Sequence, residues 1–202
     1  MSIEIKIRKA TLEDCKSITE LTLMAGEGIP AYFWEESKND DQEIIDVGKN
    51  NLTSETENFS YRNVTIANIN NKIAGMLLAY KLPPPSSDEN LDDYPEFIRP
   101  LIELELCVPN SYYINMIATY PEFRGKSVGS KLMDTVSKSA IDAGCKLISI
   151  EVFEQNQGAL TFYQRLGYKI IEKRRVVPHT CHPYTGDVVL LTKDVTTEDE
   201  YT

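Results

Sequence analysis

The first residues of the chain alternate between apolar and charged side chains. Ile3, Ile5 and Ile7 are each followed by a charged residue. This period of two predicts a half-buried strand. Thr11, with Asp14 three residues later, is typical of a helix start, so we expect the first helix over residues 12–24.

Glycines and a proline interrupt this pattern at residues 25–34, where three aromatic residues stand in a row as Tyr32, Phe33 and Trp34. The segment is either a second helix that enters the core or an aromatic and acidic wall of a ligand site. For any single aromatic residue the core is favoured, because large side chains usually bury for packing. Residues 40–52 then show loosely helical spacing with an acidic exterior.

Two apolar runs, residues 64–69 and 73–82, flank the pair Asn70 and Asn71. This arrangement predicts an antiparallel hairpin with asparagine at the turn. Gly75 indicates a bulge or the close approach of another backbone. The proline- and acid-rich stretch that follows predicts a loop and helix insertion at residues 83–110, with helical spacing over 97–106.

Strands and helices alternate along the rest of the chain. We expect strands at 112–119, 147–153, 168–177 and 187–192, and helices at 128–143 and 159–166. The acidic tail from Asp194 is expected to fray. No internal repeat is visible, so a single domain over residues 1–202 is expected.

Composition narrows the class of protein. The chain has 202 residues, 42% of them hydrophobic and 26% charged, which is typical of a soluble globular protein. Its net charge of −10 disfavours broad binding to nucleic acid or to an anionic membrane, and suits a small ligand or a cationic partner. With neither a signal-peptide pattern nor a long apolar run, the protein is expected to be cytoplasmic.

The cysteines and histidines give no metal-binding pattern. The four cysteines are widely spaced and form no CxxC pair. His179, Cys181 and His182 share one loop, but a fourth ligand at a recognisable spacing is missing. We therefore expect no metal site.

The most informative segment is an apolar strand that runs through a short turn into Arg124–Ser130 and then into a helix. Successive backbone N–H groups converge in such a loop, and the helix N-terminus adds unsatisfied donors, which predicts an anion site. Gly125 and Gly129 allow close approach, and Arg124 and Lys126 add positive charge. The spacing fits neither the P-loop nor the GxGxxG dinucleotide fingerprint.

This loop resembles the pyrophosphate loop of the GNAT superfamily of acyl-CoA-dependent N-acetyltransferases, Arg/Gln-x-x-Gly-x-Gly/Ala. Arg124, Val128 and Gly129 match, and Ser127 replaces the first glycine. Serine is small and its hydroxyl could cap the helix. The replacement would matter if the position required a positive φ, because binding would then be weakened.

A second segment resembles the same family. Residues 156–168, NQGALTFYQRLGY, follow its Asn-x-x-Ala-x-x-Phe-Tyr-x-x-x-Gly-Phe/Tyr pattern almost position by position. Two linked motifs with a strand between them are far more specific than one. The resemblance is specific over residues 112–168, and before that only the order of elements agrees.

The resemblance implies an α+β fold with α/β/α layers: a mixed, mostly antiparallel sheet with a splayed parallel strand pair and helices on both faces. It implies acetyl-CoA as cofactor, with the pantetheine arm between the strands at 112–119 and 147–152. Asn156 could contact that arm or simply cap its helix. The implied cofactor-binding residues are Ile117, Ala118, Thr119, Arg124, Gly125, Lys126, Ser127, Val128, Gly129, Ser130, Asn156 and Tyr163.

The resemblance also implies catalytic roles for two residues. A backbone N–H near Ile117 would face the carbonyl oxygen, where negative charge develops. Tyr163, a phenol that stays protonated at neutral pH, would protonate the leaving thiolate. The general base stays open among Glu27, Glu103, Glu105, the two histidines, and a water relay positioned by Tyr113 and Asn115.

The sequence thus predicts an N-acetyltransferase that acetylates a primary amine of a small molecule or a peptide. The alternative is a non-catalytic acyl-CoA sensor or interaction module. No nucleic acid or membrane partner is expected, and pairing as a homodimer stays open.

Overall fold

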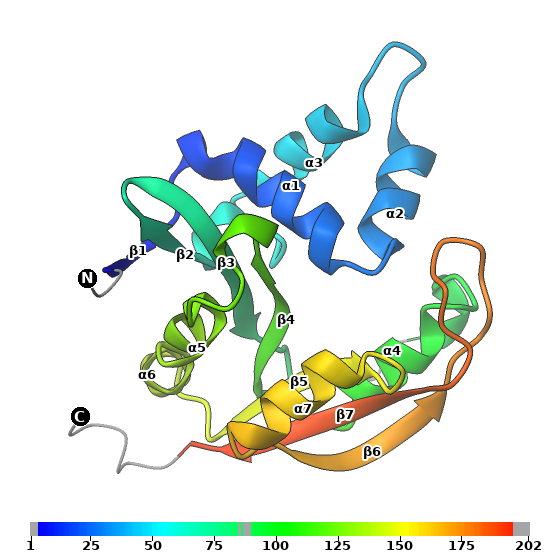
Figure 1. Ribbon diagram of the computed structural model, residues 1–202. Helices are drawn as coiled ribbons and strands as arrows, with labels where there is room; N and C mark the ends of the chain where they lie inside the picture. Colours follow the sequence, from blue (N-terminus) through cyan, green and yellow to red (C-terminus); the bar gives the residue numbers. More distant parts are fainter. Residues whose placement is uncertain (1–3, 85, 87–89, 196–202) are drawn as a thin grey trace. The chain divides into compact units, whose positions relative to one another are not determined.

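The computed structural model describes residues 4–84, 86 and 90–195. The strands are β1 Ile5–Lys9, β2 Val64–Ile69, β3 Lys72–Lys81, β4 Tyr112–Thr119, β5 Leu147–Phe153, β6 Lys169–Arg175 and β7 Asp187–Asp194. The helices are α1 Cys15–Ala25, α2 Ile29–Ser37, α3 Ile44–Leu52, α4 Arg99–Glu105, α5 Val128–Met133, α6 Val136–Asp142 and α7 Gln157–Arg165. Figure 1 shows these elements along the chain.

The seven strands follow the hydrogen-bonded order β1-β2-β3-β4-β5-β7-β6. The pairs β1–β2, β2–β3, β5–β7 and β6–β7 are antiparallel, and β4–β5 is parallel. The predicted mixed sheet with one parallel pair is therefore confirmed. The hydrogen-bonded part of that pair joins Tyr112–Ile114 to Ile148–Ile150.

The chain divides into two compact units. The first unit holds the residues up to Tyr80 together with Asn115–Thr135, and the second holds Lys81–Ile114 together with the residues from Val136 onward. The division cuts β4 between Ile114 and Asn115.

In the first unit, the predicted hairpin and its turn are confirmed. Asn70 and Asn71 both have a positive φ, 51° and 62°, which asparagine tolerates better than most residues and which a two-residue hairpin turn requires. The β2–β3 ladder shifts register after Ala67, which pairs with Gly75. The expected irregularity at Gly75 is therefore present.

The core of the first unit lies between α1 and one face of this hairpin. Ile18 and Leu21 of α1 pack with Ile66 of β2 and Met76 of β3, all with no exposed surface. On the other face, a Cβ built on Gly75 would come within 3.0 Å of Cγ1 of Val128 in α5. Helices therefore cover both faces of this part of the sheet.

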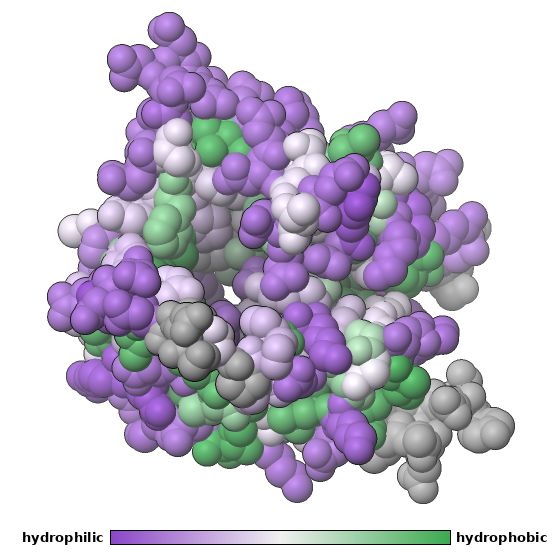
Figure 2. All heavy atoms as spheres, turned by 180° about the vertical axis from the view of Figure 1, so that it is seen from behind, coloured by the Kyte–Doolittle hydropathy of each residue, from purple (hydrophilic) through white to green (hydrophobic). Residues whose placement is uncertain are grey.

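The aromatic run forms α2. Trp34 is 4% exposed and its ring centroid lies 6.1 Å from that of Phe59, whereas Phe33 is 39% exposed. The core interpretation therefore holds for Trp34 and not for Phe33. Residues 38–43, which join α2 to α3, form the hydrophilic projection at the upper left of Figure 2.

In the second unit, helices also lie on both faces of the strands. Tyr112 hydrogen-bonds Ser139 of α6, and Arg174 of β6 donates to Glu103 of α4. The ladder registers place Tyr112 and Arg174 on opposite faces, because side chains alternate along each strand. Helix α7 packs along β5 (Figure 1).

The expectation of one helix over residues 128–143 is wrong. The helix stops at Met133 and begins again at Val136. The Thr135 hydroxyl donates to the Leu132 carbonyl at 2.7 Å, and the Thr135 N–H donates to the same carbonyl at 3.1 Å. Both bonds tighten the turn and compete with the regular helical pattern, which explains the break.

The insertion contains one short helix, α4, inside the predicted span of 97–106. Residues 85 and 87–89 of the insertion, and 196–202 of the acidic tail, lie outside the described residues. Over the part of the chain that the structure describes, no helix has both the length and the apolar character that crossing a bilayer would require.

Candidate active site

The predicted anion loop lies in the first unit, between the end of β4 and the start of α5. Residues 124–127 are exposed, and Val128 is buried beneath them. The first helical hydrogen bond of α5 runs from the Lys131 N–H to the Ser127 carbonyl at 3.0 Å. The N–H groups of residues 128–130 therefore precede the helical bonding pattern and are available to an anion.

Two residues of this loop adopt the left-handed backbone conformation. Gly125 has φ +73° and Ser127 has φ +62°. The Ser127 side chain makes no capping hydrogen bond to the helix, so the capping role considered for it is wrong. The position does require a positive φ, which is the condition under which replacing glycine by serine strains the loop.

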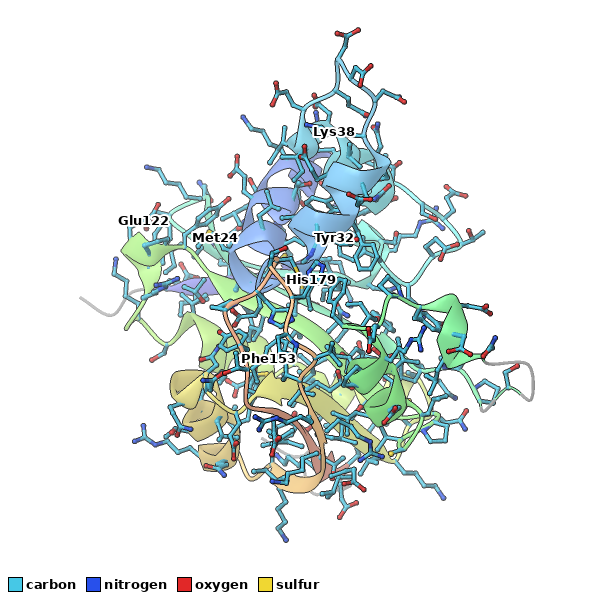
Figure 3. The ribbon with its side chains drawn as sticks, turned by 90° about the vertical axis from the view of Figure 1, so that its right-hand side faces the viewer. Met24, Tyr32, Lys38, Glu122, Phe153 and His179 are labelled. Carbon is cyan, nitrogen blue, oxygen red and sulfur yellow. The ribbon has the colours of Figure 1, made fainter. Side chains whose placement is uncertain are left out.

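The two basic side chains of the loop are held by their own turn. The Lys126 ammonium donates to the Glu122 carbonyl at 2.7 Å and lies 5.2 Å from the centroid of the Phe123 ring. The Arg124 Nε donates to the Thr119 carbonyl at 3.4 Å. Glu122, labelled in Figure 3, lies on the exposed 3-10 turn that joins β4 to the loop. The positive charges of Lys126 and Arg124 are thus held close in the chain to the N–H groups of residues 128–130.

The end of β4 leads directly into this turn. Ile117 and Thr119 are half-buried and Ala118 is buried. A Cβ on Gly75 would come within 2.4 Å of the Ala118 carbonyl oxygen, so β3 approaches here more closely than any other residue type would allow. This is the backbone approach that the sequence predicted at Gly75, and it fixes the residues just before the loop.

Asn156, which precedes α7, and Tyr163, which lies on it, belong to the second unit. The Asn156 Oδ1 accepts a hydrogen bond from the Ala159 N–H at 3.2 Å, which confirms the N-cap role. Tyr163 is 4% exposed, and its ring meets that of Tyr168 edge to face with centroids 6.0 Å apart. Burial, followed by the neighbouring Tyr168, raises the pKa of the Tyr163 phenol well above its usual value. Its hydroxyl therefore holds a proton at neutral pH.

Glu103, considered as the general base, and Asn115, considered for the water relay, have other partners. Glu103 Oε2 lies 2.7 Å from Nε of Arg174 in an ion pair. The Asn115 amide donates to the Tyr80 hydroxyl at 3.2 Å. Glu27 has φ +54° on the turn that precedes α2.

The two histidines stack in an aromatic cluster of the second unit. The His179 ring lies against Phe97 with centroids 4.0 Å apart, and the His182 ring lies 5.5 Å from that of Phe153. Burial, and then the neighbouring His179, lowers the pKa of His182. Figure 3 shows His179 on the loop before β7 and Phe153 at the end of β5.

Sequence reasoning missed one titratable residue. Glu151 is the single charged residue of β5. Both of its carboxylate oxygens are buried, and neither has a partner at hydrogen-bonding distance and angle. Burial raises the pKa of this carboxyl well above its usual value, and Glu105 adds to the effect. An acid inside the otherwise apolar run LISIEVF was the signal that could have found it.

The chain is similar to known proteins. A family model described as "Acetyltransferase (GNAT) family" matches residues 27–168. Thialysine N-epsilon-acetyltransferase of Bos taurus is 36% identical over 55 residues, which are 27% of this chain and 32% of that protein. The match thus spans about a third of the length of this curated relative.

Solved structures show the same fold. Polyamine N acetyltransferase of Drosophila melanogaster, an enzyme that catalyses the formation of N acetylagmatine, superposes with a TM-score of 0.63 at 19% identity, over 95% of this chain and 100% of that one. A GNAT family acetyltransferase of Elizabethkingia anophelis with acetyl-CoA bound gives 0.55 at 20% identity, over 94% and 97%. Since the family model spans more than half of its residues, the chain belongs to the acetyltransferase (GNAT) family.

Proposed function

We propose that this protein is a cytoplasmic N-acetyltransferase that moves the acetyl group of acetyl-CoA to a primary amine of a small molecule or peptide. Membership of the family supports the reaction class. The similar proteins named above act on thialysine or form N acetylagmatine, both of which carry basic nitrogen. A net charge of −10 favours the approach of such a cationic acceptor.

The observation that carries the proposal is the open amide loop of residues 124–130. Its N–H groups ahead of the first helical hydrogen bond, its two left-handed residues and its two basic side chains fit a diphosphate. The N–H groups of residues 125–130 would hold the diphosphate, with Arg124 and Lys126 beside it. The backbone of residues 117–119 would bind the pantetheine arm, and Asn156 would contact it while capping α7.

Acetyl-CoA supplies an acetyl group that is activated as a thioester. The Ile117 N–H donates to the carbonyl oxygen as negative charge develops there, which lowers the barrier. Tyr163 holds its proton because burial disfavours the phenolate, and it donates that proton to the leaving sulfur. The acceptor amine must be neutral when it attacks, because an ammonium ion has no free electron pair.

A thermal melt tests cofactor binding directly. Acetyl-CoA at a hundred times its Kd should stabilise the protein by about 2.7 kcal/mol. Acetyl-CoA should not change the melting temperature of the variant Gly129→Val, because a branched side chain at this position obstructs the approach of the diphosphate. A wild-type protein whose melting temperature does not respond to acetyl-CoA would contradict the proposal.

A thiol-release assay then tests turnover. Primary alkyl diamines and agmatine should release free CoA thiol, while analogues in which every primary amine is dimethylated should not, because a tertiary amine cannot form a stable amide. A thermal shift without thiol release on any primary amine would instead favour the acyl-CoA-binding module.

A further inference from the structure

Tyr120 has no role in the proposed mechanism, yet it lies between the last residue of β4 and the turn that leads to the loop of residues 124–130. Its N–H donates to the Ala74 carbonyl of β3 at 2.9 Å. Its carbonyl accepts a hydrogen bond from the Phe123 N–H at 2.9 Å. The main chain of Tyr120 therefore joins the sheet of the first unit to the turn before the loop.

The side chain of Tyr120 binds helix α1. Its ring packs against the core that α1 forms with the β2–β3 hairpin. Its hydroxyl lies 2.7 Å from Oε2 of Glu20 and 3.4 Å from the Ser17 carbonyl oxygen, and it donates to both. A hydroxyl has one proton, so the shorter bond to the carboxylate, which is the stronger acceptor, dominates.

The proton on which this bond depends is firmly held. Burial, followed by the hydrogen bond to Glu20, raises the pKa of Tyr120 to about 12. The hydroxyl is therefore a donor throughout the neutral range of pH. Residues 17–20 and Tyr120 are about half the chain apart in sequence, so this bond joins two separate parts of the first unit.

The segment that follows Tyr120 is bonded mainly to itself. Residues 121, 122 and 124–127 are exposed. Among the described residues, the hydrogen bonds of residues 121–127 all end within residues 119–131. These bonds fix the local shape of the segment. Attachment to the rest of the first unit comes from Tyr120 before the loop and from the buried Val128 after its exposed part.

We propose that Tyr120, through its hydrogen bond to Glu20, is a positioning residue that holds the loop of residues 124–130 in the conformation that binds the diphosphate of acetyl-CoA. This inference rests on the proposed N-acetyltransferase function, which assigns the diphosphate to this loop. Gly125 and Ser127 keep a positive φ, which an unattached chain seldom adopts at serine. A loop that already has this conformation binds its ligand without the cost of ordering it.

The variant Tyr120→Phe tests the hydrogen bond while it keeps the ring. The Kd for acetyl-CoA, measured by titration, should rise about fivefold, because part of the worth of a hydrogen bond to a charged group is lost from the bound conformation. A merely structural tyrosine would lower the melting temperature and leave the Kd unchanged.

Two variants of Glu20 provide a rescue test. Glu20→Gln keeps an oxygen that can accept from the Tyr120 hydroxyl, so its Kd should stay close to the wild-type value. Glu20→Ala removes the acceptor, and its Kd should rise as in Tyr120→Phe. Both variants remove the same negative charge, so charge alone cannot separate them. The double variant Tyr120→Phe with Glu20→Ala should bind no more weakly than either single variant, because the same bond is lost only once.

Two controls come from the same unit. Tyr61 also packs against the core of α1 and the hairpin, and its side chain hydrogen-bonds Arg62, so Tyr61→Phe is a matched loss of a hydroxyl. Asp14→Asn breaks the ion pair with Arg8 at the start of α1, where the two charges lie 2.7 Å apart, and should lower the melting temperature. Neither control should change the Kd for acetyl-CoA. A rise in both controls equal to that in Tyr120→Phe would overturn the inference.

The titrations separate this inference from the proposed function. If the wild type binds acetyl-CoA, and Tyr120→Phe and Glu20→Ala bind it with the wild-type Kd, the role of Tyr120 is overturned and the proposed function stands. A wild type that does not bind acetyl-CoA overturns the proposed function and this inference with it. Should Tyr120→Phe fail to fold, the comparison of Glu20→Ala with Glu20→Gln decides, because both keep the tyrosine: equal Kd values in the two would overturn the role of Tyr120.

Discussion

The two units contribute to the proposed chemistry by opposite means. In the first unit, residues 124–127 of the loop are exposed, and the proposed binding depends on the backbone: two positive φ angles and the N–H groups that precede the helical bonding of α5. In the second unit, Tyr163 is a buried side chain whose protonation is set by its surroundings. Changes of shape should therefore damage the first site, and isosteric changes of polarity should damage the second.

The largest expected effect comes from Tyr163→Phe in the second unit. The ring and its packing against Tyr168 stay, but the proton donor is lost, so kcat should fall about 100-fold. The thermal shift with acetyl-CoA should stay. Tyr168→Phe is the matched control, because Tyr168 is equally buried, and it should keep its turnover. Similar losses in both variants would point to packing and remove the role of Tyr163 as acid.

A smaller effect is expected from Gly75→Ala in the first unit. The added methyl group would lie 2.4 Å from the Ala118 carbonyl oxygen. The end of β4 must therefore move, and the loop that follows β4 must move as well. We expect the Kd for acetyl-CoA, measured by titration, to rise about tenfold, or about 1.4 kcal/mol, with little change in kcat at saturation.

Gly144→Ala is the control for this experiment. It strains a positive φ of 69° in open space, far along the chain from the loop, and should cost about 1 kcal/mol of stability with no change in Kd. If the two variants had equal affinity for acetyl-CoA, the close approach at Gly75 would have no bearing on the loop.

The smallest effect should have the opposite sign. Ser127→Gly removes the strain of a left-handed serine whose side chain makes no capping bond, and should stabilise the protein by about 0.5 kcal/mol. The Kd for acetyl-CoA should fall slightly. Ser130→Gly, inside α5, should destabilise by a similar amount, because glycine is unfavourable within a helix. Weaker binding in Ser127→Gly would show that the hydroxyl itself is used.

The local pattern of apolar, polar and turn-forming residues predicted much of the fold. The bounds of β4 and β5 agree with the apolar runs at 112–119 and 147–153, and the hairpin turn at Asn70 and Asn71 follows from the need for positive φ. The break before Val136 was not predictable from periodicity, because the apolar stripe continues across it. The break coincides with Thr135, whose hydroxyl and N–H both donate to the Leu132 carbonyl.

The same reasoning explains what was found and missed in the candidate site. The loop at 124–130 and the helix with Tyr163 carry motifs whose spacing is a local property of the chain. Glu151 carries no such motif, and its character depends on Tyr113 and Glu105, which are distant in sequence. The ion pair that occupies Glu103 likewise joins it to Arg174, 71 residues away.

Trp34 is the only tryptophan in the 202 residues, and it is buried in the first unit against Phe59. Its fluorescence emission is therefore a reporter for that unit alone, while circular dichroism averages over both. Denaturation curves from the two signals would coincide only if both units unfold in one cooperative step. The fluorescence of this tryptophan, compared with circular dichroism, therefore reports whether the two units unfold cooperatively.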